Sequence, residues 1–290
     1  MLNFNHLRLF DATVRAGSIS GAAAALRLSQ PALSKQIREL EAALEVELLE
    51  RLPRGVRPTA AGALLAGYSR RLFALGEEAE AALGELHGLR RGRLRLGASM
   101  TIGVYLAPAM LAAFRQRWPG IEVACAVENT DTIQQALMDA ELDLGLTEGP
   151  GQWDAELESR VFRRDELIVV ARDAPASLPL RQLVLLPWVM REAGSGTRAV
   201  IEAALAERGC RVEPAWTFNN PEAVKQAVLA GCGVAIMPRL AVADELAHGR
   251  MRQVRVPGLR LQRSLQLQWR RGRPRSAAMD AFLAYCTGPK

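Results

Sequence analysis

Apolar residues recur at helical spacing through the first part of the chain. They predict a helix over 4–15 that is broken at Gly17, a short helix over 18–26 capped by Ser18, and a third helix that begins at Ser29. The third helix is expected to bury a stripe of aliphatic side chains, Leu33, Ile37, Leu40 and Leu44. Three short helices with a tight turn between the second and the third form a helix-turn-helix.

The front of the third predicted helix carries side chains suited to reading DNA. In a helix-turn-helix the last helix enters the major groove, where its N-terminal residues meet base edges. Glutamine can bond adenine bidentately, while lysine, arginine and serine reach phosphates or bases. The predicted DNA contacts in this helix are Ser29, Gln30, Pro31, Ser34, Lys35 and Arg38. The alternative is an ordinary helix start with a solvated charged face.

A hairpin and a long helix are predicted next. Residues 48–62 indicate two short strands around a Pro-Arg-Gly turn, a wing whose tip carries Arg54 for a narrow minor groove. From its cap at Thr59, a helix runs to about Leu86 with a heptad seam, which favours a partner helix over burial against its own domain. The seam consists of Leu65, Tyr68, Leu72, Leu75, Ala79, Ala82 and Leu86. The two DNA-binding domains of such a dimer would match an operator with two-fold symmetry.

The second half of the chain alternates strands with helices. Two sets of such repeats, over 93–148 and 166–238, predict largely parallel sheets flanked by helices. A strand over 264–270 then returns to the first set, before a closing helix over 276–286. These patterns predict an α/β region of two sub-domains joined by crossing strands.

Hydroxyl and amide side chains follow the predicted strands in both sub-domains. In open α/β sheets a ligand lies beyond the carboxyl ends of the strands, where helix N-termini present free N–H groups. The segment REAGSGTR combines such amides with two hydroxyls and a guanidinium, which suits an anion. The predicted effector contacts are Ser99, Met100, Thr101, Asn129, Thr130, Thr147, Ser195, Gly196, Thr197 and Arg198. Ordinary helix capping is the alternative at each of these positions taken alone.

Composition excludes several classes of protein. The 290 residues are 49% hydrophobic, yet no apolar run approaches the roughly 20 residues of a spanning helix, and the N-terminus lacks the order of a signal peptide. A cytoplasmic protein that does not enter a membrane is expected. The four cysteines and three histidines are scattered, so no metal site or cofactor is predicted. GSGT lacks the spacing and lysine of a P-loop, and no catalytic set is assignable, so no enzyme is predicted.

The ordered motifs resemble the LysR-type transcriptional regulators over the whole chain. They are the helix-turn-helix, SQPALSKQIRELE, LLER, PTAAG and the long linker helix. Leu49 stands where phenylalanine is common in that family, and Pro53 lies near the wing tip. The resemblance implies an N-terminal all-α winged helix-turn-helix with a linker helix. It also implies a C-terminal α/β effector domain of two Rossmann-like sub-domains, similar to a type II periplasmic binding protein.

The resemblance also implies domain limits. The DNA-binding domain is expected over 1–58, the dimerisation helix over 59–89 and the effector domain over 90–290. Sub-domain I would comprise about 90–164 and 269–290, and sub-domain II about 165–268.

The resemblance implies a regulator that binds double-stranded operator DNA with dyad symmetry as a homodimer or homotetramer. RNA polymerase is a further candidate partner. REAGSGTR is similar to a segment in a branch that includes Calvin-cycle and sulfur-metabolism regulators. A small anionic effector is therefore expected, either an oxyanion, a phosphorylated metabolite or a carboxylate. Two alternatives stay open: an enzyme or solute-binding protein with an appended DNA-binding domain, and an effector-independent regulator.

Overall fold

The chain forms two compact units in the computed structural model, residues 1–80 and 81–290. The structure describes residues 2–86, 92–150 and 154–288. Within these residues, no helix combines the length and apolar character needed to cross a membrane. The predicted boundary between linker and effector domain, at 89–90, lies outside the described residues.

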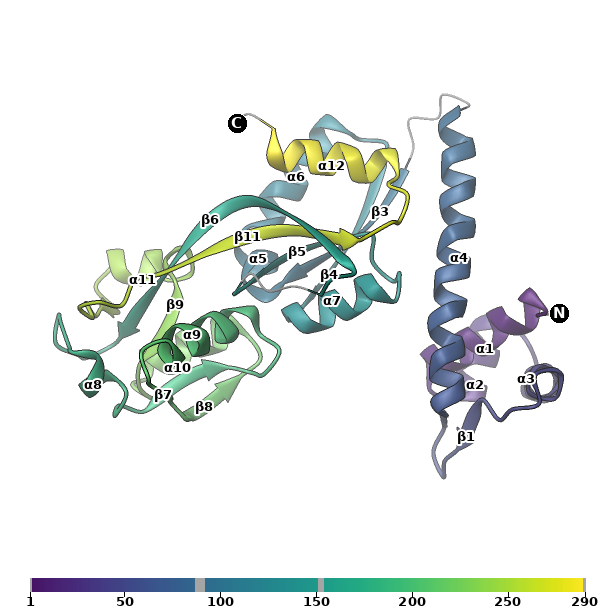
Figure 1. Ribbon diagram of the computed structural model, residues 1–290, viewed down its shortest axis with the longest axis horizontal. Helices are drawn as coiled ribbons and strands as arrows, with labels where there is room; N and C mark the ends of the chain where they lie inside the picture. Colours follow the sequence, from purple (N-terminus) through teal and green to yellow (C-terminus); the bar gives the residue numbers. More distant parts are fainter. Residues whose placement is uncertain (1, 87–91, 151–153, 289–290) are drawn as a thin grey trace. The chain divides into compact units, whose positions relative to one another are not determined.

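The first unit is built on the three predicted helices, which the structure confirms as α1 (Phe4–Ala16), α2 (Ile19–Leu26) and α3 (Gln30–Leu44) (Figure 1). Gly17 ends α1 in the left-handed region, at a φ of 62°. Ser18 caps α2 as predicted, since its hydroxyl accepts from the Gly21 N–H at 3.1 Å. The core contains Leu7, Leu9, Phe10, Leu33, Ile37, Leu40 and Leu48. Of the predicted stripe on α3, only Leu44 is not fully buried.

The predicted wing is confirmed as an antiparallel hairpin of β1 (Leu49–Arg51) and β2 (Val56–Pro58). Gly55 adopts a φ of 90°, and a Cβ there would lie 2.3 Å from the carbonyl oxygen of Gly17. The Val56 N–H donates to that same oxygen at 2.8 Å. Glycine is therefore required at position 55, because the wing rests directly on the end of α1.

The long helix is confirmed as α4 (Ala60–Leu86). Its first turn is capped by Thr59, whose hydroxyl accepts from the Gly62 N–H at 3.0 Å and donates to the Glu47 carbonyl at 2.7 Å. Four seam side chains lie exposed: Ala79, Tyr68 by 54%, Leu72 by 39% and Leu75 by 55%. Those of Ala82 and Leu86 lie outside the described part. Pairing along the seam remains a prediction.

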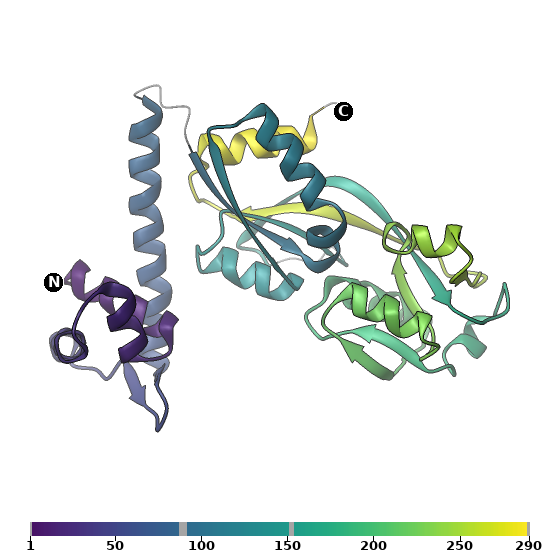
Figure 2. The ribbon, with the colours of Figure 1, turned by 180° about the vertical axis from the view of Figure 1, so that it is seen from behind.

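The second unit contains a sheet in the order β10-β6-β11-β5-β3-β4. As predicted, β3 (Gly92–Ser99) runs parallel to β4 (Ile121–Glu128) and β5 (Leu144–Gly149). Two long strands, β6 (Leu157–Ala171) and β11 (Leu261–Arg270), pair antiparallel and cross between the two lobes of the unit (Figures 1 and 2). The sequence indicated 264–270 of β11 but only 166–171 of β6, because the first part of β6 carries charged and exposed residues.

The first lobe covers its sheet with α5 (Met100–Tyr105), α6 (Ala107–Arg117), α7 (Thr130–Met138) and α12 (Ala277–Thr287). A single helix was predicted over 103–119, and this is wrong. The structure has two helices that meet at Leu106, with Pro108 in the first turn of the second, a position where proline is tolerated.

The second lobe is formed around β7 (Trp188–Arg191), β8 (Pro214–Phe218) and β9 (Ala235–Pro238), with α9 (Gly196–Ala206) and α10 (Pro221–Leu229). β7 and β8 run parallel, whereas β9 pairs antiparallel with β6. The elements that the sequence did not indicate are α8 (Leu180–Leu183), a 3-10 helix (Arg239–Ala241), α11 (Ala243–Ala247) and β10 (Arg252–Gln253). They are too short to produce a hydrophobic period.

Candidate functional site

The front of α3 is open to solvent. Ser29 caps the helix by accepting from the Ala32 N–H at 3.3 Å, and Pro31 follows in the first turn. Gln30 and Arg38 are exposed, and in the described part of the chain their side chains form no hydrogen bond or ion pair. The nearest acidic group to the ammonium of Lys35 is Glu39, at 3.8 Å. These side chains are free to meet a polyanion.

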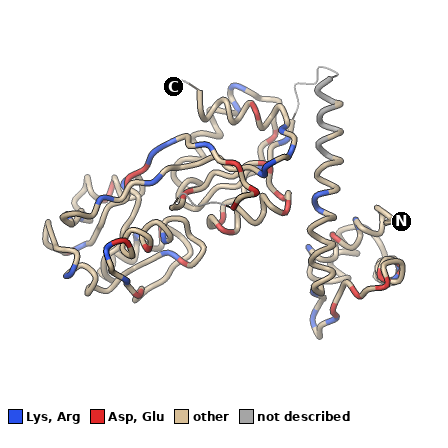
Figure 3. The backbone as a smooth tube through the Cα atoms, in the orientation of Figure 1, with Lys and Arg blue, Asp and Glu red and all other residues tan. Residues whose placement is uncertain are grey.

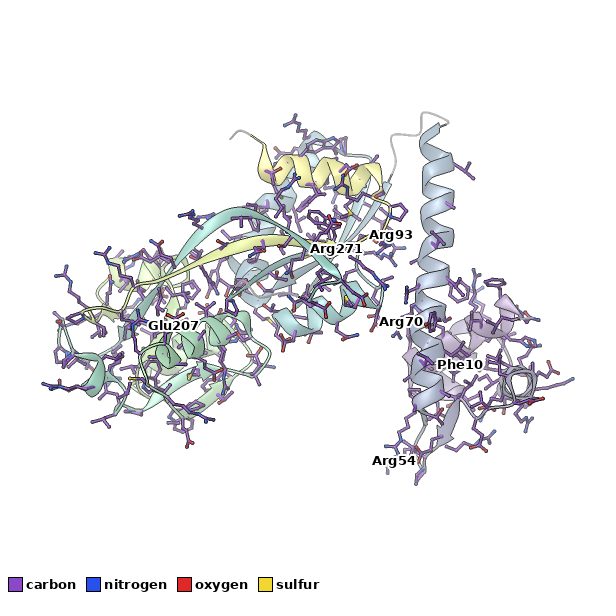
Figure 4. The ribbon with its side chains drawn as sticks, viewed as in Figure 1. Phe10, Arg54, Arg70, Arg93, Glu207 and Arg271 are labelled. Atoms are coloured by element: carbon purple, nitrogen blue, oxygen red, sulfur yellow. The ribbon has the colours of Figure 1, made fainter. Side chains whose placement is uncertain are left out.

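The wing adds a link to this helix that the sequence did not indicate. Arg51, on β1, donates to the hydroxyl of Ser34 at 3.4 Å. Arg57 pairs with Glu50 at 2.6 Å across the hairpin, and this hydrogen bond raises the pKa of Arg57. Arg54 lies exposed at the tip of the hairpin (Figure 4). The predicted minor-groove arginine is therefore the one not held by a neighbour in the wing.

We expect Gln30→Ala to relax base preference and Arg54→Ala to weaken binding to all operators. Gln30 would lose its bidentate base contact, about 1–3 kcal/mol of discrimination, whereas Arg54 would lose an electrostatic contact and lower the salt slope by about one. Quantitative footprinting over a salt series measures both effects. Arg181→Ala, in the effector domain, is the control with the same charge change. Unchanged affinity and salt slope in both variants would refute the assignment.

A cluster of buried polar side chains joins the two lobes, and we call it the Glu148 cluster: Ser99, Glu148, Asp165, Thr197 and Arg263. The Ser99 hydroxyl donates to Oε2 of Glu148, and the Thr197 hydroxyl donates to Oε1 at 3.4 Å. Arg263 Nη1 lies 3.4 Å from the same Oε1 and donates to Thr197 Oγ1 at 2.7 Å. Three elements far apart in the sequence thus converge on one carboxylate.

The charges of this cluster are almost completely withdrawn from water. The Arg263 side chain is 0% exposed and that of Glu148 is 2% exposed. Arg263 Nε also donates to Asp165 Oδ2 at 2.8 Å, so one guanidinium serves two carboxylates. Sequence reasoning missed all three residues. The available signal at Glu148 and Arg263 was a single charge inside or beside an apolar strand, whereas Asp165 stands in the charged run 163–166 and gave no such signal.

The backbone of the two lobes also meets beside the Glu148 cluster. A Cβ at Gly196 would lie 1.7 Å from the carbonyl oxygen of Glu148. Thr130 donates to that oxygen at 3.1 Å, and the Asp131 N–H donates to the Gly194 carbonyl at 3.2 Å. The N-termini of α7 and α9 are therefore in direct contact. Predicted residues Ser99, Thr130, Gly196 and Thr197 come together here.

Four other predicted residues lie near this contact in simpler roles. Asn129 caps α7 by accepting from the Thr132 N–H at 2.9 Å, and Ser195 caps α9 by accepting from the Arg198 N–H at 3.5 Å. Met100 is the half-buried first residue of α5. Thr101 is buried, and its hydroxyl has no hydrogen-bond partner among the residues that the structure describes.

Two predicted residues point elsewhere. Thr147 donates to Oε1 of Gln268 at 2.7 Å, and its hydroxyl forms no bond to the Glu148 cluster. The Arg198 guanidinium pairs with Glu202 at 2.7 Å and donates to the Arg191 carbonyl at 3.1 Å. The guanidinium in the cluster comes from Arg263 on β11 instead.

A second polar contact bridges the lobes. Tyr105, at the end of α5, donates to Glu222 at 2.9 Å, and Lys225 lies 3.0 Å from the same carboxylate. Burial raises the pKa of Glu222, but hydrogen bonds from Lys225, Gln226 and Tyr105 outweigh it and hold that pKa below its usual range. Burial and the bond to Glu222 raise the pKa of Tyr105. Beside the crossing strands, polar side chains thus connect the lobes both at the Glu148 cluster and at Glu222.

Residues 4–63 match the model of the bacterial regulatory helix-turn-helix protein, lysR family. Residues 87–288 match the LysR substrate binding domain. The chain belongs to the LysR family. The winged helix-turn-helix, linker helix and two-lobed α/β domain predicted from the sequence are the architecture of this LysR-type regulator.

Similar proteins are found along the whole chain. The uncharacterised HTH-type transcriptional regulator YeiE of Escherichia coli strain K12 is 34% identical over 98% of this chain and 97% of its own. The RuBisCO operon transcriptional regulator of Allochromatium vinosum is 36% identical over 97% of this chain and 94% of its own. The CcmR regulatory domain of Synechocystis PCC6803, solved with 2-PG, is 28% identical, with a TM-score of 0.63 over 68% of this chain and 96% of that one.

Proposed function

We propose that this LysR-type regulator binds operator DNA as a homodimer or homotetramer, has no enzymatic activity of its own, and responds to a small anionic effector at the Glu148 cluster. The observation that carries the proposal is the arrangement of donors around a carboxylate. Two hydroxyls and a buried guanidinium, from Ser99, Thr197 and Arg263, converge on one negatively charged group. Donors that already complement a carboxylate suit an oxyanion, a phosphate ester or a second carboxylate.

An external anion would take the place of the Glu148 side chain. Both groups compete for the same donors, so binding requires the carboxylate of Glu148 to turn away from Ser99 and Thr197. The unpaired hydroxyl of Thr101 offers a further donor. The CcmR domain of Synechocystis was solved with 2-PG, which supports a site for a small ligand in this domain.

Effector binding would act by shifting a population of conformations. The lobes meet where the backbone at Gly196 touches the Glu148 carbonyl, so displacing Glu148 changes the contact between α7 and α9. A ligand that favours one arrangement of the lobes alters the oligomer by its difference in affinity for the two arrangements. The exposed seam on α4 would transmit this change to the paired DNA-binding units.

A thermal-shift screen of the full chain tests the proposal with sulfate, sulfite, phosphate, sugar phosphates and small carboxylates. An anion at a hundredfold excess over its dissociation constant stabilises the effector domain by about 2.7 kcal/mol. Thr197→Val should abolish the shift, whereas Thr132→Val, which removes an exposed hydroxyl on α7, should leave it unchanged. Glu148→Gln should increase anion affinity, because a neutral amide competes less well for Arg263.

The proposal would be wrong if none of these anions stabilised the protein, or if Thr197→Val kept the full shift. The first outcome favours a second candidate, a regulator that needs no effector. Its supporting observation is that the hydroxyls of Ser99 and Thr197 and Nη1 of Arg263 already have hydrogen-bond partners within the protein. An operator footprint that no small molecule changes is the result expected for that candidate.

A further inference from the structure

A cavity of about 370 Å³ lies between α9 and the crossing strands β6 and β11. We call it the β11 cavity. Its polar wall is formed by Arg164, Glu207, Arg208, Arg260, Ser264 and Gln266. None of the residues predicted to hold the effector lines it, but Arg263 belongs to its wall as well as to the Glu148 cluster. The cavity is therefore a neighbour of the proposed effector site and not a part of it.

The charge of the β11 cavity is positive. Four guanidinium groups line the cavity, those of Arg164, Arg208, Arg260 and Arg263, with one carboxylate, that of Glu207. Arg208 lies 3.6 Å from Glu207, and Arg263 pairs with Glu148 and Asp165. In the described part of the chain, Arg164 and Arg260 form no ion pair and no side-chain hydrogen bond. Figure 3 shows Lys and Arg in blue along β6 and β11, and Glu207 is labelled in Figure 4. Because the guanidinium groups of Arg164 and Arg260 have no counter-charge there, the cavity is suited to bind an anion from solution.

Two further side chains of the cavity, Arg208 and Gln266, are placed where they can bond a ligand. Arg208 is held in position because its guanidinium donates to the Ala204 carbonyl at 2.6 Å and to the Gly258 carbonyl at 3.2 Å. Gln266 is only 7% exposed, yet its amide has no side-chain hydrogen-bond partner in the described residues. Because Gln266 lines the cavity, its amide can form a hydrogen bond with a ligand there.

The remaining wall of the cavity is apolar. Val200, Ala203 and Ala204 of α9 and Leu261 of β11 contribute aliphatic surface. A free inorganic ion would leave this surface uncovered, whereas an organic molecule would bury it. The volume lies within the range of about 300–1,000 Å³ that holds small organic ligands.

We infer that the β11 cavity binds a small organic dianion, either a phosphate monoester or a dicarboxylate. Arg164 and Arg260 would neutralise its two charges, Arg208 would add a fixed donor, and the Gln266 amide would bond a neutral oxygen. The aliphatic residues of α9 would contact its carbon atoms. This site is separate from the one under the proposed function, and it stands if that proposal fails.

Isothermal titration of the full chain with glycerol 3-phosphate and with succinate tests the inference, with glycerol as the uncharged control. We expect at least one dianion to bind and glycerol not to bind. Arg164→Ala and Arg260→Ala should each weaken binding at least about tenfold, because each removes a charge-assisted hydrogen bond. These exposed positions carry no structural bond, so folding is retained. The matched control is Arg163→Ala, the exposed neighbour on β6 outside the cavity, which should change affinity less than about twofold.

The Thr197→Val variant distinguishes binding in the β11 cavity from binding at the Glu148 cluster. It should leave dianion binding to the cavity intact. Loss of binding in Thr197→Val would overturn the inference, since the dianion would then occupy the Glu148 cluster. The inference is equally overturned if neither dianion binds the wild-type chain, or if Arg163→Ala weakens binding as much as Arg164→Ala. The tighter binding of glycerol 3-phosphate or of succinate decides whether the cavity takes a phosphate monoester or a dicarboxylate.

Discussion

Replacing Arg263 by methionine is expected to lower the free energy of unfolding of the effector domain by about 3–5 kcal/mol. The substitution keeps an unbranched side chain of similar length but removes the only cation within the Glu148 cluster. Glu148 and Asp165 would then be two buried carboxylates without a counter-charge. An uncompensated buried charge costs more than the ion pair contributes to stability, so the loss is large.

Tryptophan fluorescence during urea unfolding measures this change in the effector domain alone. All five tryptophans of the chain lie beyond residue 117, and none lies in the DNA-binding unit. Arg164→Met, at an exposed position on β6, is the matched control and should change the free energy of unfolding by less than about 0.5 kcal/mol. Adding Glu148→Gln and Asp165→Asn to Arg263→Met should recover part of the loss. If Arg263→Met lowered the free energy of unfolding by less than about 1 kcal/mol, that result would contradict the buried ion cluster.

Gly196→Ala is expected to separate the N-termini of α7 and α9. The added methyl group would lie 1.7 Å from the Glu148 carbonyl oxygen and 2.6 Å from Thr130 Oγ1, so the backbone must move. Strain of this kind costs about 1–3 kcal/mol of stability. Because the lobes meet at this point, we also expect the variant to lose its conformational response to effector.

Urea unfolding and the thermal-shift screen measure the two effects in the same variant. The control is Gly76→Ala in α4, where nothing lies within 4 Å of the added carbon. It should keep or raise helix stability, by up to about 1 kcal/mol, in far-UV circular dichroism. If Gly196→Ala kept wild-type stability and a wild-type response to effector, α9 would not be in contact with the Glu148 carbonyl.

Local signals in the sequence were sufficient for the first unit. The helical period of Leu33, Ile37 and Leu40 predicted the buried face of α3, and the caps Ser18 and Thr59 marked where two helices begin. Hairpin formation between β1 and β2 followed from a turn motif within one short segment. Such features depend on residues within a few positions of one another, so the chain itself specifies them.

Longer elements of the second unit were harder to predict. The alternation of strands and helices predicted the α/β fold class of this unit. However, β6 begins nine residues before Glu166, where the predicted strand began. This part of β6 pairs with β11 and carries exposed arginines, so it shows neither an apolar run nor a clean alternation. Strand pairing with a distant partner determined its length.

The sequence by itself determined the family, the order of domains and the residues at the front of α3. Only the tertiary structure decided which charges meet at the Glu148 cluster. Arg263 lies 98 residues from Asp165 and 66 from Thr197, and Arg198, the guanidinium adjacent to the predicted anion site, pairs with Glu202 instead. A buried charge is stable only beside a partner that the fold brings to it, and no local pattern records that partner.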